Sequence, residues 1–378
     1  MPVRKRLLDF LAVVTPGLEE VAKEELTALG VEVSEEHRGG LGFRAEMLDA
    51  MRVNLHARCV GRLWLRMGRF RAGAVPELYN RTAKLPWARR LAPESVVVLR
   101  AHAQRSRLIH TGRIMDAVRD AINTLVPIKV VAEADAPPEA QRILIRLVDN
   151  QCEISLDTSG ALLHRRGYRQ QTGRAPLRET TAAALLRWAQ WDGTTPLVDP
   201  MCGSGTFVLE GALMAAKKAP GAERRFAFEF WRKYDAYNWR RLGTEAKASE
   251  DFGAVPLLMG SDRNAEAIKA ARGNATRAGL TQHINFQNVD VQSVRIPISP
   301  AGLLVCNPPY GTRIGSRESL DPVYRQLGAR IKALTGWRAM VLSADSTLRK
   351  TLVSVVKRRP LKEVEFDHGG LKVTTTLF

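Results

Sequence analysis

Cysteine is scarce in this chain of 378 residues. The four cysteines, Cys59, Cys152, Cys202 and Cys306, lie far apart, and no two of them form a CxxC pair. Such spacing provides neither a zinc site nor a disulfide framework. We therefore expect a protein of the reducing cytoplasm that holds no metal.

Long apolar runs are also lacking. No stretch of about 18 uninterrupted apolar residues occurs, so no segment is expected to span a membrane. The N-terminus, MPVRKRLLDFLAVVTPGLEE, begins basic and then turns apolar, as a signal peptide does. Its apolar run is short, lacks a small-residue cleavage site and is followed by acidic, helix-like sequence. We expect no membrane partner.

Acidic residues are few relative to basic ones. The chain has 57 Lys and Arg against 39 Asp and Glu, which gives a formal net charge of +18. A positive field of this size attracts polyanions, and nucleic acid is the commonest of them. A general solubility charge or an arginine-rich proteome would leave the same excess. The length allows two or three domains, and the 45% hydrophobic fraction is ordinary for globular domains.

The first part of the chain alternates short apolar runs with helical spacing. The patterns predict helices over 18–29, 47–55 and 106–122, and strands over 10–14, 31–33, 41–45, 58–69, 96–101, 142–148 and 151–156. Asp149-Asn150 separates the last two strands and is typical of a hairpin turn. These elements indicate an α+β region.

A polar, basic stretch over 165–178, RRGYRQQTGRAPLR, predicts a junction between domains. From Glu179 onward, helices and strands alternate, as a doubly wound parallel sheet requires. No repeat or low-complexity tract interrupts either part.

The sharpest motif is LVDPMCGSGTFVLEGALMAA, which begins at Leu197. An apolar strand ends at Asp199, Gly203-Ser204-Gly205 forms a tight turn, and a helix is predicted to begin near Thr206. Glycines let the backbone approach a ligand closely, and the N–H groups at a helix N-terminus favour a carboxylate. No Lys follows Gly205, so this is not a phosphate-binding P-loop, and the six-residue dinucleotide fingerprint fits poorly. A loop without a ligand is the alternative.

Two acids follow the next two predicted strands. Asp262 comes after the strand over 255–260, and Asp290 ends the strand over 284–289. A helix is predicted between the two strands, over 265–278. A carboxylate in the first position can accept from both ribose hydroxyls of a nucleotide-like ligand. One in the second position can accept from an adenine amino group. Each alone is equally well explained as a helix cap, and their order after the glycine turn favours the ligand.

A fourth predicted strand, over 302–306, ends in Asn307-Pro308-Pro309-Tyr310. The Asn307 oxygen and the Pro308 carbonyl can accept the two hydrogens of an exocyclic base amine, which would turn its lone pair toward a sulfonium methyl group. No nucleophile or strong base is then needed. Tyr310 can stack on a base flipped out of its helix. A rigid turn is the alternative, and Cys306 is interpreted as a buried strand residue.

The segments 199–206 and 307–310 together resemble the class I methyltransferases that act on amino groups. SRLIHTGRIMDAVRDAI and ISLDTSGALLHRRGYR resemble the RNA-binding THUMP domain and its exit into a methyltransferase. TPGLEEVAKEELTALG is similar to the ferredoxin-like segment that begins the same proteins. The resemblance covers nearly the whole chain. It points to the bacterial THUMP methyltransferases that form N2-methylguanosine in 23S ribosomal RNA, in the form with a single methyltransferase domain.

The resemblance implies an α/β fold. It consists of a Rossmann-like, seven-stranded class I methyltransferase sheet preceded by an α+β, ferredoxin-like and THUMP RNA-binding region. The implied domains are a ferredoxin-like segment over 1–60, a THUMP domain over 61–163 and a methyltransferase domain over 164–378. We expect a monomer.

The resemblance also implies the cofactor, S-adenosylmethionine. Its methionine end would lie on the turn at Gly203-Ser204-Gly205, its ribose at Asp262 and its adenine at Asp290. The residues predicted to bind it are Asp199, Pro200, Gly203, Ser204, Gly205, Thr206, Asp262, Arg263 and Asp290. The residues predicted to receive the target amine are Asn307, Pro308, Pro309 and Tyr310.

The expected function is methylation of the N2 amine of a guanine in 23S ribosomal RNA. Guanine N2 in transfer RNA, adenine N6 in a nucleic acid, and a ribosome-assembly factor that binds RNA without catalysis stay open. In the expected function the first half would hold RNA phosphates with arginines such as Arg105, Arg107, Arg165 and Arg169. The aromatics and arginines over 220–242 suit RNA stacking or packing against the sheet, and we favour packing.

Overall fold

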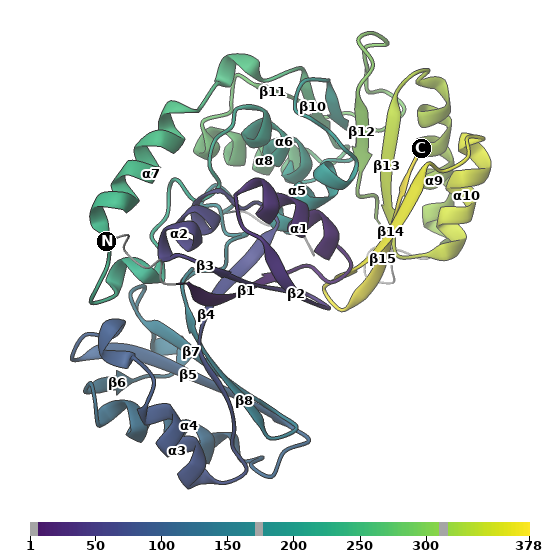
Figure 1. The fold of residues 1–378 in the computed structure, drawn as a ribbon. Helices are drawn as coiled ribbons and strands as arrows, with labels where there is room; N and C mark the ends of the chain where they lie inside the picture. The colour runs from purple at the N-terminus through teal and green to yellow at the C-terminus, as the bar shows by residue number, and fades with distance from the viewer. Residues whose placement is uncertain (1–6, 171–176, 310–316) are drawn as a thin grey trace. The chain divides into compact units, whose positions relative to one another are not determined.

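The computed structural model describes residues 7–170, 177–309 and 317–378 (Figure 1). They form two compact units. The first unit contains residues 7–13, Glu25–Leu163 and Arg224–Thr244. The second unit contains Val14–Glu24, His164–Glu223 and Glu245–Phe378. The division passes through two helices, α1 (Glu19–Ala28) and α7 (Ala236–Ala248).

The first unit is built on one mixed sheet of eight described strands in the order β2-β3-β1-β4-β8-β7-β5-β6. The strands are β1 (Leu8–Val14), β2 (Val33–His37), β3 (Gly40–Ala45), β4 (Val60–Arg71), β5 (Ser95–Gln104), β6 (Ile128–Val130), β7 (Gln141–Val148) and β8 (Gln151–Asp157). The helices that lie wholly in this unit are α2 (Met47–His56), α3 (Val75–Ala83) and α4 (Thr111–Asn123).

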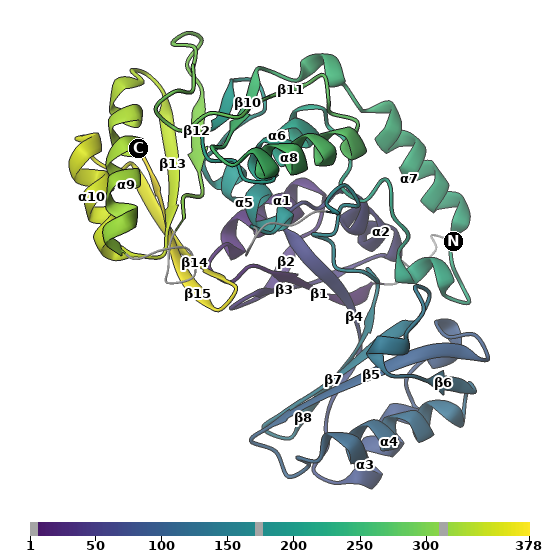
Figure 2. The same cartoon turned by 180° about the vertical axis from the view of Figure 1, so that it is seen from behind.

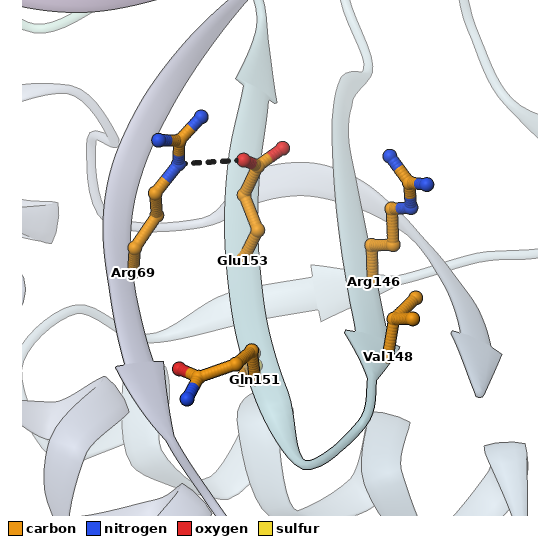
Figure 3. A pocket seen from close by; sticks show the side chains of 6 residues that line it. Arg69, Arg146, Val148, Gln151 and Glu153 are labelled. Atoms are coloured by element: carbon orange, nitrogen blue, oxygen red, sulfur yellow. Dashed lines mark hydrogen bonds and ion pairs between the residues drawn. The ribbon is translucent and has the colours of Figure 1, made fainter. Parts of the chain in front are cut away.

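The strands of this sheet alternate between a buried and an open face. On β7, Ile143, Ile145 and Leu147 are buried, whereas Arg146 between them is exposed. Helices α3 and α4 lie along one face of β5, β7 and β8 in both views (Figures 1 and 2). The other face carries polar side chains, among them Arg69 and Glu153 of neighbouring strands (Figure 3). This is the pattern of a sheet with one face in the core and one in water.

The second unit is built on a sheet of seven described strands in the order β11-β10-β9-β12-β13-β15-β14. The strands are β9 (Leu197–Asp199), β10 (Leu258–Ser261), β11 (Ile284–Gln287), β12 (Leu303–Cys306), β13 (Arg338–Ser343), β14 (Lys362–His368) and β15 (Leu371–Leu377). The helices are α5 (Glu179–Trp188), α6 (Thr206–Ala215), α8 (Ala265–Ala278), α9 (Arg317–Ala333) and α10 (Ser346–Val356). The predicted seven-stranded methyltransferase sheet is confirmed.

The middle of this sheet is parallel and buried. β10 and β12 pair in parallel with the two sides of β9, so the strand order reverses at β9. Every residue of β9, β10 and β12 is buried, as expected of parallel strands covered on both faces. One buried cluster contains Leu304, Tyr324, Leu327 and Trp337. At a reversal of this kind the carboxyl ends of the strands open a crevice for a ligand.

The last hairpin of the second unit packs against residues from the start of the chain. The Asp367 N–H donates to the Pro16 carbonyl at 3.0 Å. The next residue, Gly17, has a φ of +97°, and a Cβ there would lie 2.1 Å from the Glu365 carbonyl oxygen. Only glycine fits such a position, so the turn and the hairpin fix each other.

Several predicted elements are confirmed. The helix over 265–278 has the predicted bounds. Asp149 and Asn150 form the predicted hairpin turn with φ values of 51° and 60°, and Gly369-Gly370 joins β14 to β15. The helix predicted from residue 106 begins only at Thr111. The preceding residues form a loop because the Ser106 hydroxyl donates to the Gln104 carbonyl and accepts from Asn150 N–H.

The first part of the predicted junction over 165–178 also packs into the second unit. Arg166 and Tyr168 are buried in the second unit, and Arg169 is nearly so. Their basic and aromatic character serves packing, as shown below. Residues 171–176 lie outside the described residues. Within the described parts of the chain, no helix is long and apolar enough to cross a membrane.

Candidate active site

The glycine turn leads from β9 into α6 with a backbone that needs glycine. Gly203 and Gly205 have φ values of +54° and +86°. A Cβ at Gly205 would lie 3.2 Å from the Phe286 ring and 3.3 Å from the Ala271 methyl, so this residue packs tightly. A Cβ at Gly203 would meet nothing within 4 Å. The turn is therefore supported from below at Gly205 and open to a ligand at Gly203.

Asp262 ties this turn to the next strand. One carboxylate oxygen accepts the Gly203 N–H at 2.9 Å, and the other accepts the Asn264 N–H at 2.9 Å. Each oxygen keeps further lone-pair capacity. The carboxylate is therefore held at the open side of the turn, where it can still accept from a bound hydroxyl. Arg263 beside it is exposed.

Asp199 ends β9 beneath the same turn and is buried. The pKa of its carboxyl is raised to about 8: burial is the main cause, a hydrogen bond from the Met201 N–H acts against it, and the nearby Asp262 charge adds a smaller upward effect. At neutral pH Asp199 is thus largely protonated. Pro200 after it is also buried.

Asp290 differs from its prediction in position. β11 ends at Gln287, so Asp290 lies beyond the strand end and is exposed. Its Oδ1 accepts the N–H groups of Gln292 and Ser293 at 2.9 and 3.1 Å. Capping of this turn pulls the residue out of the strand. Its predicted contact with adenine stays a prediction.

Asn307 follows β12 at the same edge of the sheet. Because β12 pairs in parallel with β9, the carboxyl ends of the two strands meet there. The Oδ1 atom of Asn307 is buried and has no hydrogen-bond partner among the described residues. Pro308 is buried and Pro309 half-buried, whereas Tyr310 lies outside the described residues. An orphaned acceptor is costly unless a donor from elsewhere satisfies it.

The cysteines near this edge are inert. Burial, with lesser effects of Asp199 and Asp262, raises the pKa of both Cys202 and Cys306 well above the ordinary value. A thiol that stays protonated is a poor nucleophile. Cys306 is fully buried, as the sequence interpretation held.

A buried polar network lies behind the turn, and it was not predicted. Thr206, the first residue of α6, accepts a hydrogen bond from the Arg169 guanidinium. Arg169 also pairs with Glu179 of α5 at 3.3 Å, and both side chains are at most 8% exposed. The prediction that Arg169 holds RNA phosphate is therefore wrong, because its charge is used inside the unit.

Glu210, one turn further along α6, extends this network. It is fully buried, accepts from the Tyr168 hydroxyl at 2.8 Å and lies 3.6 Å from Arg166. Burial, with the Glu210 charge second, raises the pKa of Tyr168 well above its ordinary value. A lone glutamate in the otherwise apolar helix TFVLEGALMA was the sequence signal for such partners.

The turn itself is held from a third side. Asn274 of α8 is fully buried, and its amide donates to the Ser204 carbonyl at 3.1 Å. The glycine turn is thus held by contacts with α6, α8 and the end of β10, all from within the protein. Such preorganisation lowers the cost of binding.

Residues 166–375 match the family model described as "RMKL-like, methyltransferase domain". The chain belongs to the RMKL-like methyltransferase family. Residues 9–64 match the model of the RlmL ferredoxin-like domain, so the predicted ferredoxin-like start is confirmed. The THUMP resemblance stays a prediction.

Two relatives show how this RMKL-like chain compares in length. A Synechocystis protein provisionally named an RNA methyltransferase is 35% identical over 369 residues, with 97% of this chain and 95% of the relative aligned. "Ribosomal RNA large subunit methyltransferase K/L" of Methylococcus capsulatus is 38% identical over 352 residues, with 90% of this chain and 47% of the relative aligned. The chain spans about half the length of the K/L relatives it matches.

Two solved structures support the fold and the cofactor. The crystal structure of SMU.472 with SAH has a TM-score of 0.90 and 28% identity, covering 99% of this chain and 98% of that one. A Listeria monocytogenes structure described as a predicted N6-adenine-specific DNA methylase has a TM-score of 0.86 and 27% identity, covering 98% and 96%. S-adenosylmethionine, of which SAH is the demethylated product, is the cofactor of this RMKL-like protein.

The residues present suit this cofactor. The open space over Gly203 admits the donor, and the Asp262 carboxylate is held beside it. The unmet acceptor of Asn307 lies at the end of the neighbouring strand. The structure thus brings Gly203, Asp262, Asp199 and Asn307 to one edge of the sheet.

Proposed function

We propose that this chain transfers the methyl group of S-adenosylmethionine to the N2 amine of a guanine in 23S ribosomal RNA. The observation that supports an amine as methyl acceptor is the Asn307 Oδ1 atom. This atom is buried and has no hydrogen-bond partner among the described residues, at the end of the strand beside the glycine turn. An exocyclic amine brings the N–H donor that this oxygen lacks. The names of the K/L relatives support ribosomal RNA of the large subunit as substrate.

The chemistry follows from where acceptors lie. When bound, S-adenosylmethionine would supply an electrophilic methyl group on its sulfonium, its sulfur would leave as the thioether of S-adenosylhomocysteine, and one proton of the methylated amine would pass to water. Asn307 and the Pro308 carbonyl would accept the two amine hydrogens, so that the nitrogen lone pair is withdrawn from the ring and aimed along the line of transfer. Tyr310 would stack on the extruded base.

The donor would be held by Asp199, Pro200, Gly203, Ser204, Gly205, Thr206, Asp262, Arg263 and Asp290. Asp262→Ala should raise the dissociation constant of S-adenosylmethionine by tenfold or more, because it removes a ribose acceptor and the bond that holds Gly203. Calorimetry with the variant and with Glu266→Ala, an exposed acid one turn away, measures this. Unchanged affinity would remove Asp262 from the donor site.

The base is decided by nucleoside mass spectrometry of ribosomal and transfer RNA from cells with and without the protein. We expect loss of N2-methylguanosine at one 23S position, restored by the wild-type chain and not by Asn307→Ala. Loss of N6-methyladenosine would instead support the second candidate, which the description of the Listeria structure favours. Loss confined to transfer RNA would overturn the ribosomal substrate.

The non-catalytic alternative makes a different prediction. A ribosome-assembly factor with an inactive site would not bind S-adenosylmethionine. If it did bind the cofactor, its Asn307→Ala variant would support growth as well as the wild-type chain does. The intact turn and the preorganised Asp262 argue against it.

The three consecutive domains over 1–60, 61–163 and 164–378, with a THUMP module in the middle, are part of this proposal, as is action as a monomer. The middle segment would bind RNA and the last would catalyse. Arg105 pairs with Asp149 at 2.9 Å, so the Asp149 carboxylate partly offsets its positive charge. Other cations must therefore contribute to RNA binding.

A further inference from the structure

The segment Arg224–Thr244 belongs to the first unit although it lies inside the methyltransferase sequence. Within its 21 residues are six Lys and Arg and only two Asp and Glu. It also contains seven aromatic residues. No residue of this segment takes part in the site at the sheet edge.

Most of these aromatics anchor the segment. Phe226 and Phe228 are buried, stack at 5.3 Å, and both meet the edge of Trp239 at 5.3 and 5.1 Å. The Trp231 Nε1–H donates to Gln141 Oε1 at 2.7 Å in the interior of the unit. Packing, the favoured prediction for this region, is therefore confirmed for these residues.

One aromatic is used differently. Tyr237, in the first turn of α7, is 72% exposed and is the only aromatic among the exposed large hydrophobic side chains of the described residues. Arg240 and Arg241 follow it by three and four positions, so the three side chains share one side of the helix. Both arginines are exposed. Leu242 and Ala246 on the other side of α7 are buried.

More positive charge lies beside this helix. Arg232 and Lys233 immediately precede it and are exposed. Arg90 lies over the Trp231 ring at 4.8 Å, and its backbone carbonyl accepts the Arg232 N–H at 3.0 Å. Of the two acids in the segment, Asp235 caps Asn238 and Glu229 bonds the Phe226 N–H. The outer side of the segment is thus cationic around one exposed ring.

A second arginine-bearing surface makes a useful contrast. On the open face of the eight-stranded sheet, Arg69 donates to Glu153 at 2.8 Å (Figure 3). It also donates to Glu35 at 2.7 Å. Arg66 shares both carboxylates and also pairs with Asp9, so these two arginines face three acidic side chains. A phosphate would have to approach past two carboxylates, so this surface is the weaker candidate for a polyanion.

We propose that the outer side of the segment Arg224–Thr244 is an RNA-docking arm, in which Tyr237 stacks on an unpaired base and Arg232, Lys233, Arg240 and Arg241 contact the flanking phosphates. The inference rests on the proposed function, since it takes RNA as the substrate. Exposed rings with surrounding cations are how proteins hold unpaired nucleotides. A protein partner fits less well, because interface cores are depleted in charge. The arm belongs to the first unit, whereas Asn307 and the glycine turn belong to the second, so we expect the arm to contribute to affinity and not to the methyl transfer itself.

The test uses the full chain, protein-free 23S RNA and three measurements: RNA affinity at several salt concentrations, methyl transfer, and affinity for S-adenosylmethionine. Tyr237→Ala should weaken RNA binding roughly five- to hundredfold, the worth of one stacked base. Tyr237→Phe should restore it. Arg240→Ala/Arg241→Ala should lower the slope of log affinity against log salt by about 1 to 2, since each lost phosphate contact contributes nearly one. KM for RNA should rise while kcat at saturating RNA and donor affinity stay unchanged.

Lys332→Ala/Lys357→Ala is the matched control, because it removes two exposed cations from the groove between α9 and α10. An equal effect of the two pairs would overturn the proposal in favour of general electrostatics. An RNA affinity of Tyr237→Phe as low as that of Tyr237→Ala would overturn the stacking role. Wild-type binding of naked RNA by every variant, with a defect only on ribosomal particles, would replace RNA by a protein partner. If the wild-type chain methylates no RNA, the proposed function fails; if it does and the variants match it, only the docking arm fails.

Discussion

The surroundings of the glycine turn and the outer, exposed arginines of the eight-stranded sheet place charge in different ways. Around the glycine turn of the seven-stranded sheet, three acidic side chains are buried: Asp199, Glu179 and Glu210. On the open face of the eight-stranded sheet many arginines are exposed, with side-chain exposures of 41% for Arg69 and 62% for Arg100. Buried charges interact strongly with one or two partners, whereas exposed charges are screened and act as a sum. Single substitutions should therefore be costly in the first setting and mild in the second.

The largest effect is expected at Glu210. Glu210→Ala removes the carboxylate that faces Arg166 and the Tyr168 hydroxyl in the interior. Loss of one partner from a buried ion pair costs about 3–5 kcal/mol of stability. Urea unfolding of the variant measures this, with Glu210→Gln as the control that keeps an acceptor for Tyr168. A loss below about 1 kcal/mol would erase the contrast between the sheets.

Asn307 should follow closely, in activity instead of stability. Asn307→Ala should lower kcat by about 10²–10³, the usual cost of one preorganised group at a reacting centre. Donor affinity should stay within a few-fold. Steady-state methylation and calorimetry measure the two, and Asn285→Ala, an exposed asparagine on β11, is the matched control. A variant with wild-type turnover would exclude Asn307 from the mechanism.

Asp199 gives a graded effect that depends on pH. Its folded pKa of about 8 lies above the ordinary 3.8, so between these values the folded chain keeps a proton that the unfolded chain releases. Stability should then fall as pH rises across this window, by about 1.4 kcal/mol per pH unit, and level off above pH 8. Asp199→Asn should remove this slope when unfolding is followed from pH 5 to 8. Parallel curves for the two proteins would mean that Asp199 is ionised when folded.

The smallest effect is expected on the open sheet face. Arg69→Ala should change stability by no more than about 1 kcal/mol, because the ion pairs are exposed. The pKa of Glu35, which the Arg69 hydrogen bond lowers to about 2 against the cost of burial, should rise toward its ordinary value. Denaturation and an NMR titration of Glu35 test this. A loss as large as that of Glu210→Ala would show that exposure is a poor guide in this sheet.

Sequence patterns predicted the turns at the candidate site better than the packing of the first unit, and the reason is physical. The glycines at 203 and 205 and the prolines at 308 and 309 impose backbone geometry locally, so their spacing is visible in one dimension. Helix α8 was predicted with its bounds because Asn264 caps its start and Gly279 ends it in a left-handed conformation.

What failed depended on partners distant in sequence. Arg169 looked like a surface cation until Glu179 and Thr206 were placed beside it. The helix predicted from Ser106 begins later because the Ser106 hydroxyl accepts a hydrogen bond from the Asn150 N–H. The membership of Arg224–Thr244 in the first unit is likewise a tertiary fact, since its anchors are Gln141 and the carbonyls of Ser159 and Leu162. No local pattern encodes such contacts.

The bond between Pro16 and Asp367, with Gly17 pressed against Glu365, has a consequence for synthesis on the ribosome. The second unit needs residues 14–24 together with the hairpin of β14 and β15, whereas the sheet of the first unit is complete once residue 157 has emerged. Contacts that close over long chain separations form late. The sheet of the first unit can therefore form while the chain is still growing, whereas the catalytic unit acquires β14 and β15 only after residue 377 has emerged. The chain would then become able to methylate only after the sheet of the first unit, which carries the proposed docking arm, has already formed.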